Sequence, residues 1–164
     1  MVLRCTARLL ELLGERASTL VDAPLSDDDW YANVVWLDRR KCLLLVHAGT
    51  LFPILVADVR KRDLRVLGPY LVAAIATALD QEHFPRHALG ELDADAVRLA
   101  RTASRSVLGF MTEMALDCRY HVEAAGGLAN ADTEVLNQRL RRTLHSRDGY
   151  HQPLELVARQ LQTP

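Results

Sequence analysis

The chain has 164 residues, of which 49% are hydrophobic and 25% charged, and its formal net charge is −1. This length fits a single domain over residues 1–164, and folding should bury about 70% of the unfolded surface. The near-zero net charge excludes a protein whose overall field attracts nucleic acid or an anionic membrane. Three widely spaced cysteines and no apolar leader favour buried thiols in a reducing cytoplasm, and no apolar run is long enough to span a membrane.

The first 29 residues predict one strand and one helix. Residues 2–6 form a short segment typical of a strand. Thr6 is a suitable N-cap for a helix over residues 7–13, whose leucines supply an apolar face and which Gly14 ends. Residues 15–29 contain Pro24 and many Asp and Ser residues, a composition that indicates a loop.

Residues 30–57 predict the sheet. Three apolar runs, rich in Val, Leu, Ile, Trp and Phe, are separated by the short polar joints 38–41 and 48–50. Joints this short force neighbouring strands to be antiparallel, because a parallel return needs a long crossover. Residues 42–46 are apolar without alternation, which favours a strand covered on both faces. Pro53 lacks an N–H donor and therefore indicates an edge strand or a bulge.

The remainder of the chain has helical periodicity. Helices are expected from Pro69, from Ala94 behind the N-cap Asp93, over residues 105–125, behind Asp132, and from Pro153. The fold class is therefore predicted to be α+β. We expect a small antiparallel sheet of three to four strands from the N-terminal third, packed by four to five helices from the C-terminal two thirds.

Several segments resemble an uncharacterised bacterial family, a domain of unknown function that occurs alone and fused within some plasmid-encoded open reading frames. These segments are residues 3–10, 30–33, 40–50 and 104–111, and the pair Leu136-Asn137. Thr112-Glu113 departs from the family's pattern, which has Asn followed by an acidic residue. The resemblance covers nearly the whole chain and implies an intact domain. It implies no activity, because the family has none established.

The first functional hypothesis is a small cytoplasmic, non-catalytic protein-binding or regulatory module, associated with a mobile element or a defence system. Trp30 and Tyr31 stand beside the acidic loop and are residue types that dominate binding hot spots. Arg39 and Arg40 follow at the joint after the first long strand. The simpler interpretation of the same rings is that they are core residues, and the identity of the partner and the oligomeric state stay open.

The alternative is a nucleic-acid-binding accessory factor. Arg98, Arg101 and Arg105 recur at helical spacing, and Arg141 and Arg142 add a second cluster that could neutralise phosphates. Against this hypothesis, only 5% of residues are aromatic and acidic residues are as numerous as basic ones. Eighteen of the 20 basic residues are arginine, which is also typical of a GC-rich genome.

An enzyme with a dispersed site is the third hypothesis. No nucleophile elbow, Walker loop, His-Glu-x-x-His or Gly-x-Gly-x-x-Gly motif is present. His47 at a strand end, or Cys118, would be the first residue to consider. His83 and His87 with Cys118 and His121 have spacings that a zinc site would require to converge, but Pro85 separates the first two. We therefore expect no metal and no cofactor.

Overall fold

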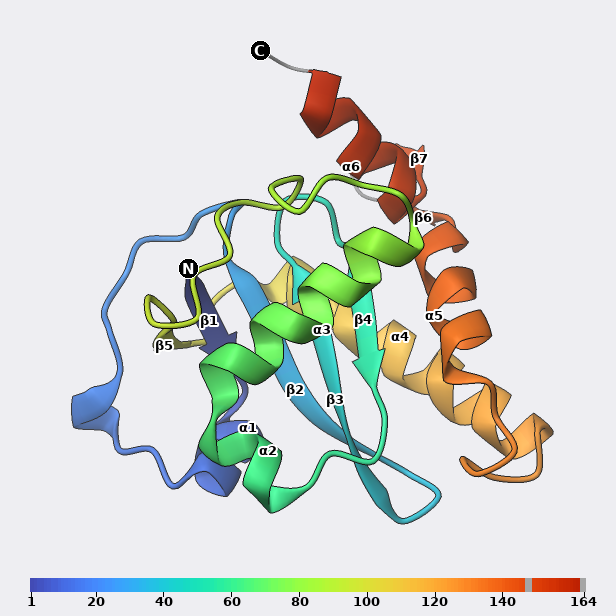
Figure 1. Cartoon of the computed structure of the whole chain (residues 1–164), viewed down its shortest axis with the longest axis horizontal. Helices are drawn as coiled ribbons and strands as arrows, with labels where there is room; N and C mark the ends of the chain where they lie inside the picture. The colour runs from blue at the N-terminus through green and yellow to red at the C-terminus, as the bar shows by residue number, and fades with distance from the viewer. Residues whose placement is uncertain (147–148, 163–164) are drawn as a thin grey trace.

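The computed structural model describes residues 1–146 and 149–162. Its centre is a five-stranded sheet in the order β4-β3-β2-β1-β5 (Figure 1). The strands are β1 (Val2–Cys5), β2 (Trp30–Leu37), β3 (Arg40–His47), β4 (Pro53–Val56) and β5 (Arg98–Arg101). A separate two-stranded ladder joins β6 (His145–Ser146) and β7 (Tyr150–His151).

Strands β2, β3 and β4 are antiparallel, which confirms the prediction for residues 30–57. Every residue from Cys42 to His47 is buried, as expected for a strand covered on both faces. Pro53 begins β4, which is the outermost strand on its side of the sheet, so the prediction of an edge strand there is also confirmed.

The predicted sheet of three to four antiparallel strands is wrong, because the sheet has five strands and is mixed. β1 pairs in parallel with β2 on one side and with β5 on the other. Residues 98–101, expected within a helix, form β5 instead. The four residues, Arg-Leu-Ala-Arg, lack the alternation of apolar and polar residues that indicates a strand, and pairing with the distant β1 decides their conformation.

Six α-helices surround the sheet in the described part of the chain. One comes from the N-terminal third and five come from the C-terminal two thirds, which agrees with the four to five helices expected there. They are α1 (Ala7–Leu13), α2 (Lys61–Arg65), α3 (Leu67–Gln81), α4 (Arg105–Ala124), α5 (Thr133–Arg142) and α6 (Pro153–Gln162). The loop 15–29 contains one 3-10 turn, Ala17–Thr19. Asp132 caps α5 as predicted, accepting hydrogen bonds from Glu134 N and Val135 N. None of the described helices combines the length and apolar character that a membrane crossing requires.

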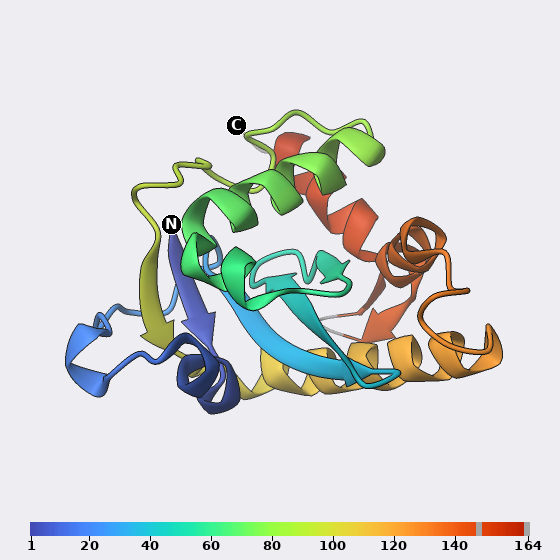
Figure 2. The ribbon, with the colours of Figure 1, turned by 60° about the horizontal axis from the view of Figure 1, so that its bottom comes forward.

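The helices form two layers, one on each face of the sheet (Figure 2). Alternate residues of β2 point to opposite faces. Trp30, Ala32 and Val34 belong to a core shared with α1 and α3, whereas Tyr31 and Val35 belong to a second core shared with α4 and α5. The fold is thus a sheet between two helical layers, and each layer has its own apolar core.

The outer edge of β4 is closed by polar side chains. Asn137 Oδ1 accepts a hydrogen bond from Leu55 N at 2.7 Å, and its Nδ2 donates to Leu55 O at 2.9 Å. Pro53 has no N–H, and its carbonyl accepts from Arg141 Nε at 3.4 Å. These contacts occupy backbone groups that an incoming strand would otherwise use, so they protect the edge against pairing with another chain.

Candidate binding surface

The turn between β2 and β3 presents two arginines to solvent. Asp38 and Arg39 both have positive φ, 47° and 58°, as the two central residues of a type I′ hairpin turn require. A non-glycine residue in this region costs about 1 kcal/mol, so Arg39 occupies a position that glycine would fill with less strain. Asp38 Oδ2 accepts a hydrogen bond from Leu128 N at 3.1 Å and anchors the turn. Arg39 and Arg40 themselves remain exposed.

Trp36 lies one step inside the same hairpin. Its side chain is 41% exposed, which is unusual for a tryptophan in a central strand of this sheet. The guanidinium of Arg8, from α1, lies over its ring at 5.9 Å from the centroid. Lys41 pairs with Trp36 across the β2–β3 ladder. An aromatic face, a guanidinium and an ammonium group therefore come together at the end of the hairpin.

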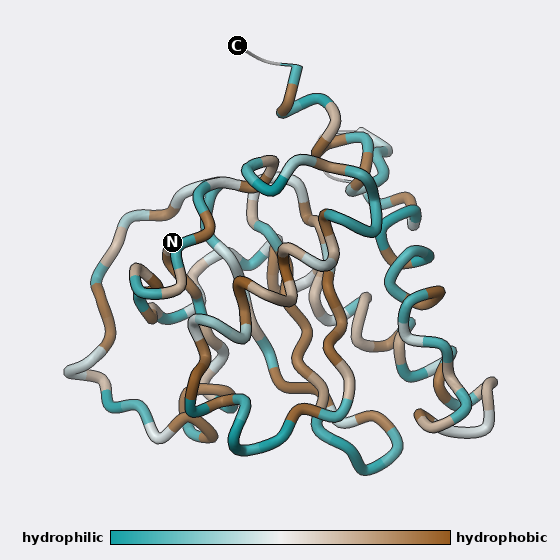
Figure 3. The backbone as a smooth tube through the Cα atoms, in the orientation of Figure 1, coloured by the Kyte–Doolittle hydropathy of each residue, from teal (hydrophilic) through white to brown (hydrophobic). Residues whose placement is uncertain are grey.

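A third segment brings further positive charge to this end. The backbone N–H of Val59 donates to Lys41 O at 2.8 Å, and Arg40 is 3.6 Å from Asp58. These contacts attach residues 58–60 to β3, and α2 follows directly. We call the resulting cluster the basic end; it consists of Arg8, Arg39, Arg40, Lys41, Arg60, Lys61, Arg62 and Arg65. Figure 1 shows α1, α2 and the β2–β3 turn at one end of the sheet, and Figure 3 shows α2 and this turn as hydrophilic backbone beside apolar strands.

The charge of the basic end is only partly balanced. Three carboxylates lie among its eight cations: Asp38, Asp58 and Asp63. Asp38 bonds to Leu128, and Asp63 closes the first turn of α2 by accepting from Arg60 N. The opposite end of the sheet is formed by loops 22–29 and 82–97 and exposes acidic groups (Figure 1). These groups are Asp22, Asp27, Asp28, Glu91, Asp93 and Asp95. A net charge of −1 therefore conceals two ends of opposite charge.

Trp30 and Tyr31, predicted as partner-binding residues, are both only 1% exposed. The Trp30 ring packs edge-on against His47, with centroids 5.2 Å apart. The Tyr31 hydroxyl accepts a hydrogen bond from Ser104 N at 3.2 Å, next to the start of α4. Both rings belong to the two cores, so among the four residues of the first hypothesis only Arg39 and Arg40 reach the surface.

The arginines of the nucleic-acid hypothesis do not gather. Arg98 and Arg101 are exposed on β5, and Arg105 is exposed at the start of α4. Arg141 lies beside β4, at the other edge of the sheet, and is fully buried. Its Nη1 is 3.0 Å from Glu82 Oε1, while Arg142 Nη2 is 2.7 Å from Glu82 Oε2. The second cluster is thus engaged inside the chain and faces away from the first.

The pKa of Glu82 reflects its contacts with these two arginines. Burial alone would raise the pKa of its carboxyl group. Hydrogen bonds and positive charge from Arg142 and Arg141 outweigh burial and hold the pKa below its usual range. Glu82 therefore stays ionised at neutral pH, and the two arginines act as its counter-ions.

A second buried ion pair, Arg4 with Asp29, was not anticipated from the sequence. Arg4 Nε is 2.5 Å from Asp29 Oδ2, and its Nη2 donates to the carbonyls of Ala23 and Pro24. Both side chains are about 5% exposed or less. The pair attaches the loop before β2 to β1. A charged residue between the buried Leu3 and Cys5 of a short strand was the available signal, because such a residue needs an internal counter-ion.

The residues considered for catalysis are buried and neutral. Burial lowers the pKa of His47 to about 4 and raises the pKa of Cys118 to about 12. His47 Nδ1 lies 3.0 Å from Thr50 Oγ1 and accepts from Thr50 N, which leaves the imidazole proton on Nε2. Within residues 1–146 and 149–162, no three His, Cys, Asp or Glu side chains converge as a metal site. Neither thiolate nor imidazolium is available at these two positions near neutral pH.

Residues 2–156 match the family described as a domain of unknown function, DUF6933, and the chain belongs to this family. A comparison with curated proteins and one with solved structures gave no match. The membership confirms the uncharacterised domain family expected from the sequence, and it assigns no activity.

Proposed function

We propose that this protein is a non-catalytic binding module whose basic end docks onto an acidic surface or segment of another protein. The observation that carries the proposal is the concentration of eight cations, including both lysines of the chain, at the end of the sheet where Trp36 is half exposed. Arginine and tryptophan are the residue types most enriched at binding hot spots. Arg39, held in a left-handed conformation at the tip, adds to this support.

The contacts of the basic end fit a partner that offers both carboxylates and apolar contact. Exposed guanidinium groups bind carboxylates through two parallel hydrogen bonds. The stacked Arg8–Trp36 pair supplies a flat amphipathic surface. Between the turn and the C-terminal end of α4 lies a cavity of about 390 Å³, lined by Arg39, Arg119 and Gly127 among others. Two carboxylates, Asp38 and Glu123, line the same cavity, so the cavity itself has no net positive charge and the exposed arginines outside it carry the attraction.

A protein partner fits better than nucleic acid for two reasons. The carboxylates Asp38 and Asp58 are interspersed among the cations, and a continuous phosphate backbone would meet them. Nucleic-acid platforms also stack successive bases on several aromatic rings. Trp36 is the single exposed large aromatic residue among the residues of the hairpin and α2.

The family resemblance also supports a proposal for the context of this binding. We propose that the protein acts in the cytoplasm of a bacterium, as a regulatory component linked to a plasmid, another mobile element or a defence system. The partner would then be another protein of the same system, and recognition would need no cofactor and no membrane. Such a role agrees with a small module that has buried, neutral thiols and a charged end.

The proposal can be tested by titration with an acidic probe peptide. A 15-residue peptide rich in glutamate is added at low salt, and the emission of the exposed Trp36 is followed. We expect saturable binding that the double variant Arg39→Glu, Arg40→Glu weakens by at least about tenfold, because each reversed charge turns attraction into repulsion. The matched control is Arg98→Glu, Arg101→Glu, which makes the same charge change on β5 and should leave the affinity within about twofold.

Two results would contradict the proposal. Equal losses in both double variants would show a response to total charge and not to the basic end. Tight binding of a 15-nucleotide single strand, with a weaker response to the peptide, would instead support the nucleic-acid alternative. If Arg98→Glu, Arg101→Glu also abolishes binding of the single strand, the nucleic acid binds at β5 and not at the basic end.

A further inference from the structure

The carboxyl ends of β1 and β5 lie side by side at one edge of the sheet. The two strands are parallel neighbours, and Cys5 at the end of β1 pairs with Arg101 at the end of β5. The helix that follows β1 contributes to the core on the α3 face of the sheet, whereas the helix that follows β5 contributes to the core on the other face. In open sheets covered by helices on both faces, ligands bind in the crevice where two neighbouring parallel strands diverge in this way. The topology therefore indicates a ligand site at this edge, which we call the β1–β5 crevice (Figure 2).

A cavity of about 540 Å³ lies in the β1–β5 crevice, and its volume is in the range of small-molecule sites. Leu10 of α1 and Leu20, which follows the 3-10 turn, form apolar parts of its wall. The loop side of the wall is attached to the sheet, because Val21 N donates to a backbone carbonyl of β5 at 2.8 Å. Cys5, which is 1% exposed, also lines the cavity. Burial and the negative charge of Glu15 raise the pKa of Cys5 to about 12, so this thiol is neutral.

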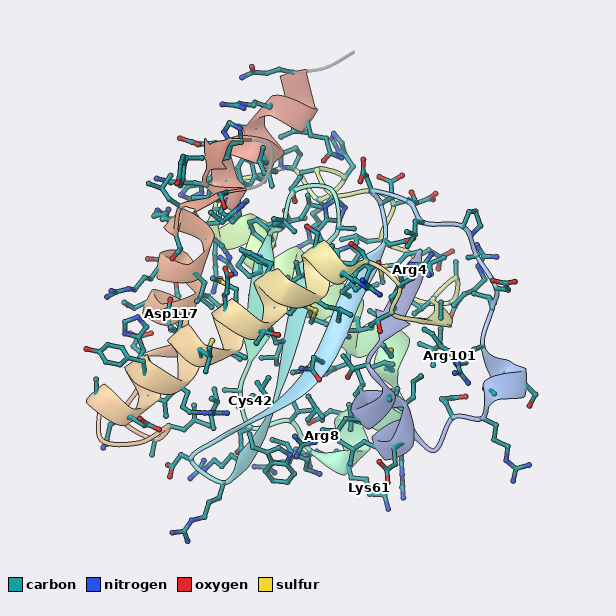
Figure 4. All side chains as sticks on the ribbon, turned by 180° about the vertical axis from the view of Figure 1, so that it is seen from behind. Arg4, Arg8, Cys42, Lys61, Arg101 and Asp117 are labelled. Carbon is teal, nitrogen blue, oxygen red and sulfur yellow. The ribbon has the colours of Figure 1, made fainter. Side chains whose placement is uncertain are left out.

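Three charged side chains line the same cavity. Glu11 of α1 and Glu15 contribute carboxylates, and Arg101 contributes a guanidinium group. Among the described residues, the side chains of Glu11 and Arg101 have no hydrogen-bond or ion-pair partner. The Glu15 carboxylate accepts one hydrogen bond, from Thr19 Oγ1 at 2.6 Å. Figure 4 shows Arg101 between α1 and the loop that contains the 3-10 turn, so charges of both signs are available to a ligand there.

We propose that the β1–β5 crevice binds a free α-amino acid whose side chain is cationic, such as lysine. Two carboxylates and one guanidinium group give the cavity one negative charge in excess, and lysine has one positive charge in excess. Glu11 and Glu15 are counter-ions for its two ammonium groups, and Arg101 binds its carboxylate through two parallel hydrogen bonds. The aliphatic chain of the ligand packs against Leu10 and Leu20.

The same charges disfavour other classes of small molecule. A nucleotide or a dicarboxylate would bring negative charge against Glu11 and Glu15. A diamine would leave Arg101 without an anion, and an amino acid with an apolar side chain would leave one carboxylate without a cation. Because a charged group that loses its water without gaining a partner weakens binding, a basic amino acid should bind more tightly than either of these.

Isothermal titration calorimetry of the full chain with L-lysine at low salt tests the proposal. We expect saturable binding with a dissociation constant of about 10–500 µM, as suits a small ligand in a partly open site. Two analogues provide the comparison: cadaverine lacks the carboxylate, and L-norleucine lacks the side-chain ammonium group. Each should bind at least about tenfold more weakly than lysine. Absence of binding up to about 10 mM lysine, or an analogue that binds as tightly as lysine, would overturn the proposal.

Arg101→Gln removes the proposed partner of the ligand's carboxylate. It should weaken lysine binding by at least about tenfold and bind cadaverine no more weakly than the wild-type chain does, because cadaverine has no carboxylate to lose. Arg98→Gln is the matched control, since Arg98 is exposed on the same strand but points to the opposite face of the sheet. If Arg98→Gln weakened lysine binding as much as Arg101→Gln, total charge would explain the effect and the proposed site would be wrong.

Glu11→Gln removes one of the two proposed counter-ions of the ammonium groups. It should weaken both lysine and cadaverine by at least about fivefold, whereas Glu113→Gln, an exposed position on α4, should leave both affinities within about twofold. Undiminished lysine binding by Glu11→Gln would contradict the proposal. These side chains are exposed, so unchanged thermal midpoints would separate loss of the ligand from loss of the fold. The β1–β5 crevice shares no residue with the basic end, so acidic-peptide binding should be the same in Glu11→Gln and the two proposals can fail separately.

Discussion

The β4 edge and the basic end use the same residue types in opposite ways. At the β4 edge, Arg141, Arg142 and Asn137 find their partners inside the chain, on Glu82 and on the backbone of β4. At the basic end, Arg39 and its neighbours project into solvent with few internal partners. Arginine content by itself therefore says nothing about function. Burial and the presence of an internal acceptor distinguish an arginine that holds the fold together from one that is available to a partner.

The largest effect is expected from breaking the buried ion pair beside β4. Glu82→Ala removes the counter-ion of Arg141 and leaves a guanidinium buried without charge compensation. We expect the free energy of unfolding to fall by about 3–5 kcal/mol, measured by urea denaturation. Arg142→Ala is the control: Arg142 is about half exposed, so its loss should cost less than ~1 kcal/mol. Equal losses of unfolding free energy in the two variants would mean that the buried Arg141–Glu82 pair contributes no more to stability than the half-exposed Arg142–Glu82 pair.

Removing the side chain that closes the sheet edge should have the next largest effect. Asn137→Ala leaves the N–H and C=O of Leu55 without their hydrogen-bond partners. We expect a loss of about 2 kcal/mol in the free energy of unfolding, from denaturant titration. Asn137→Asp keeps the acceptor for Leu55 N but turns a carboxylate oxygen toward the carbonyl oxygens of Leu55 and Thr133, so it should destabilise the protein at least as much as Asn137→Ala at neutral pH. A fully native stability for Asn137→Ala would show that water replaces the amide without penalty.

A comparable effect should appear on acidification, through His47. Burial holds the pKa of His47 at about 4, compared with 6.5 in the unfolded chain. Its contribution is fully present above pH 6.5 and is lost as the pH falls toward 4, because the unfolded state then binds a proton that the folded state does not. Between pH 7 and pH 5 this amounts to about 2 kcal/mol of unfolding free energy.

The control for this prediction is His47→Gln, which retains a polar side chain but cannot titrate. The pH dependence of the wild-type chain should exceed that of the variant by this amount over the same interval. Parallel profiles would show that His47 takes up its proton equally in both states.

The smallest effect on stability is expected at the basic end. Arg40→Ala removes a half-exposed pair with Asp58, and the free energy of unfolding should change by less than ~0.5 kcal/mol. The same variant should nevertheless weaken binding of the acidic peptide, measured by the emission of Trp36. The comparison between the two regions would fail if Arg40→Ala destabilised the protein as strongly as Glu82→Ala.

Local patterns in the sequence were sufficient for much of the fold. Hydrophobic periodicity predicted α4, the predicted cap Asp132 lies where α5 begins, and the short joints of residues 30–57 imposed antiparallel pairing. The sequence was insufficient for β5 and for the parallel pairing of β1, since β1 pairs with β5 through residues such as Leu3 and Leu99 and with β2 through Leu3 and Trp30, which no local pattern brings together. Trp30 and Trp36 show the same limit for function: both occupy one strand and point to one face, but only Trp36 is exposed.

The sequence by itself determined the helices with strong periodicity, the antiparallel hairpins, the edge position of Pro53 and the positive charge of residues 39–41 and 60–62. Each of these features depends on residues only a few positions apart in the sequence, whose relative positions are fixed by the geometry of the backbone. Only the tertiary structure decided which arginines are buried, which tryptophan is exposed, and that residues 8, 36, 41 and 61 meet at one end of the sheet. Such outcomes depend on which distant segments pack together, because burial and charge pairing are properties of the packed whole.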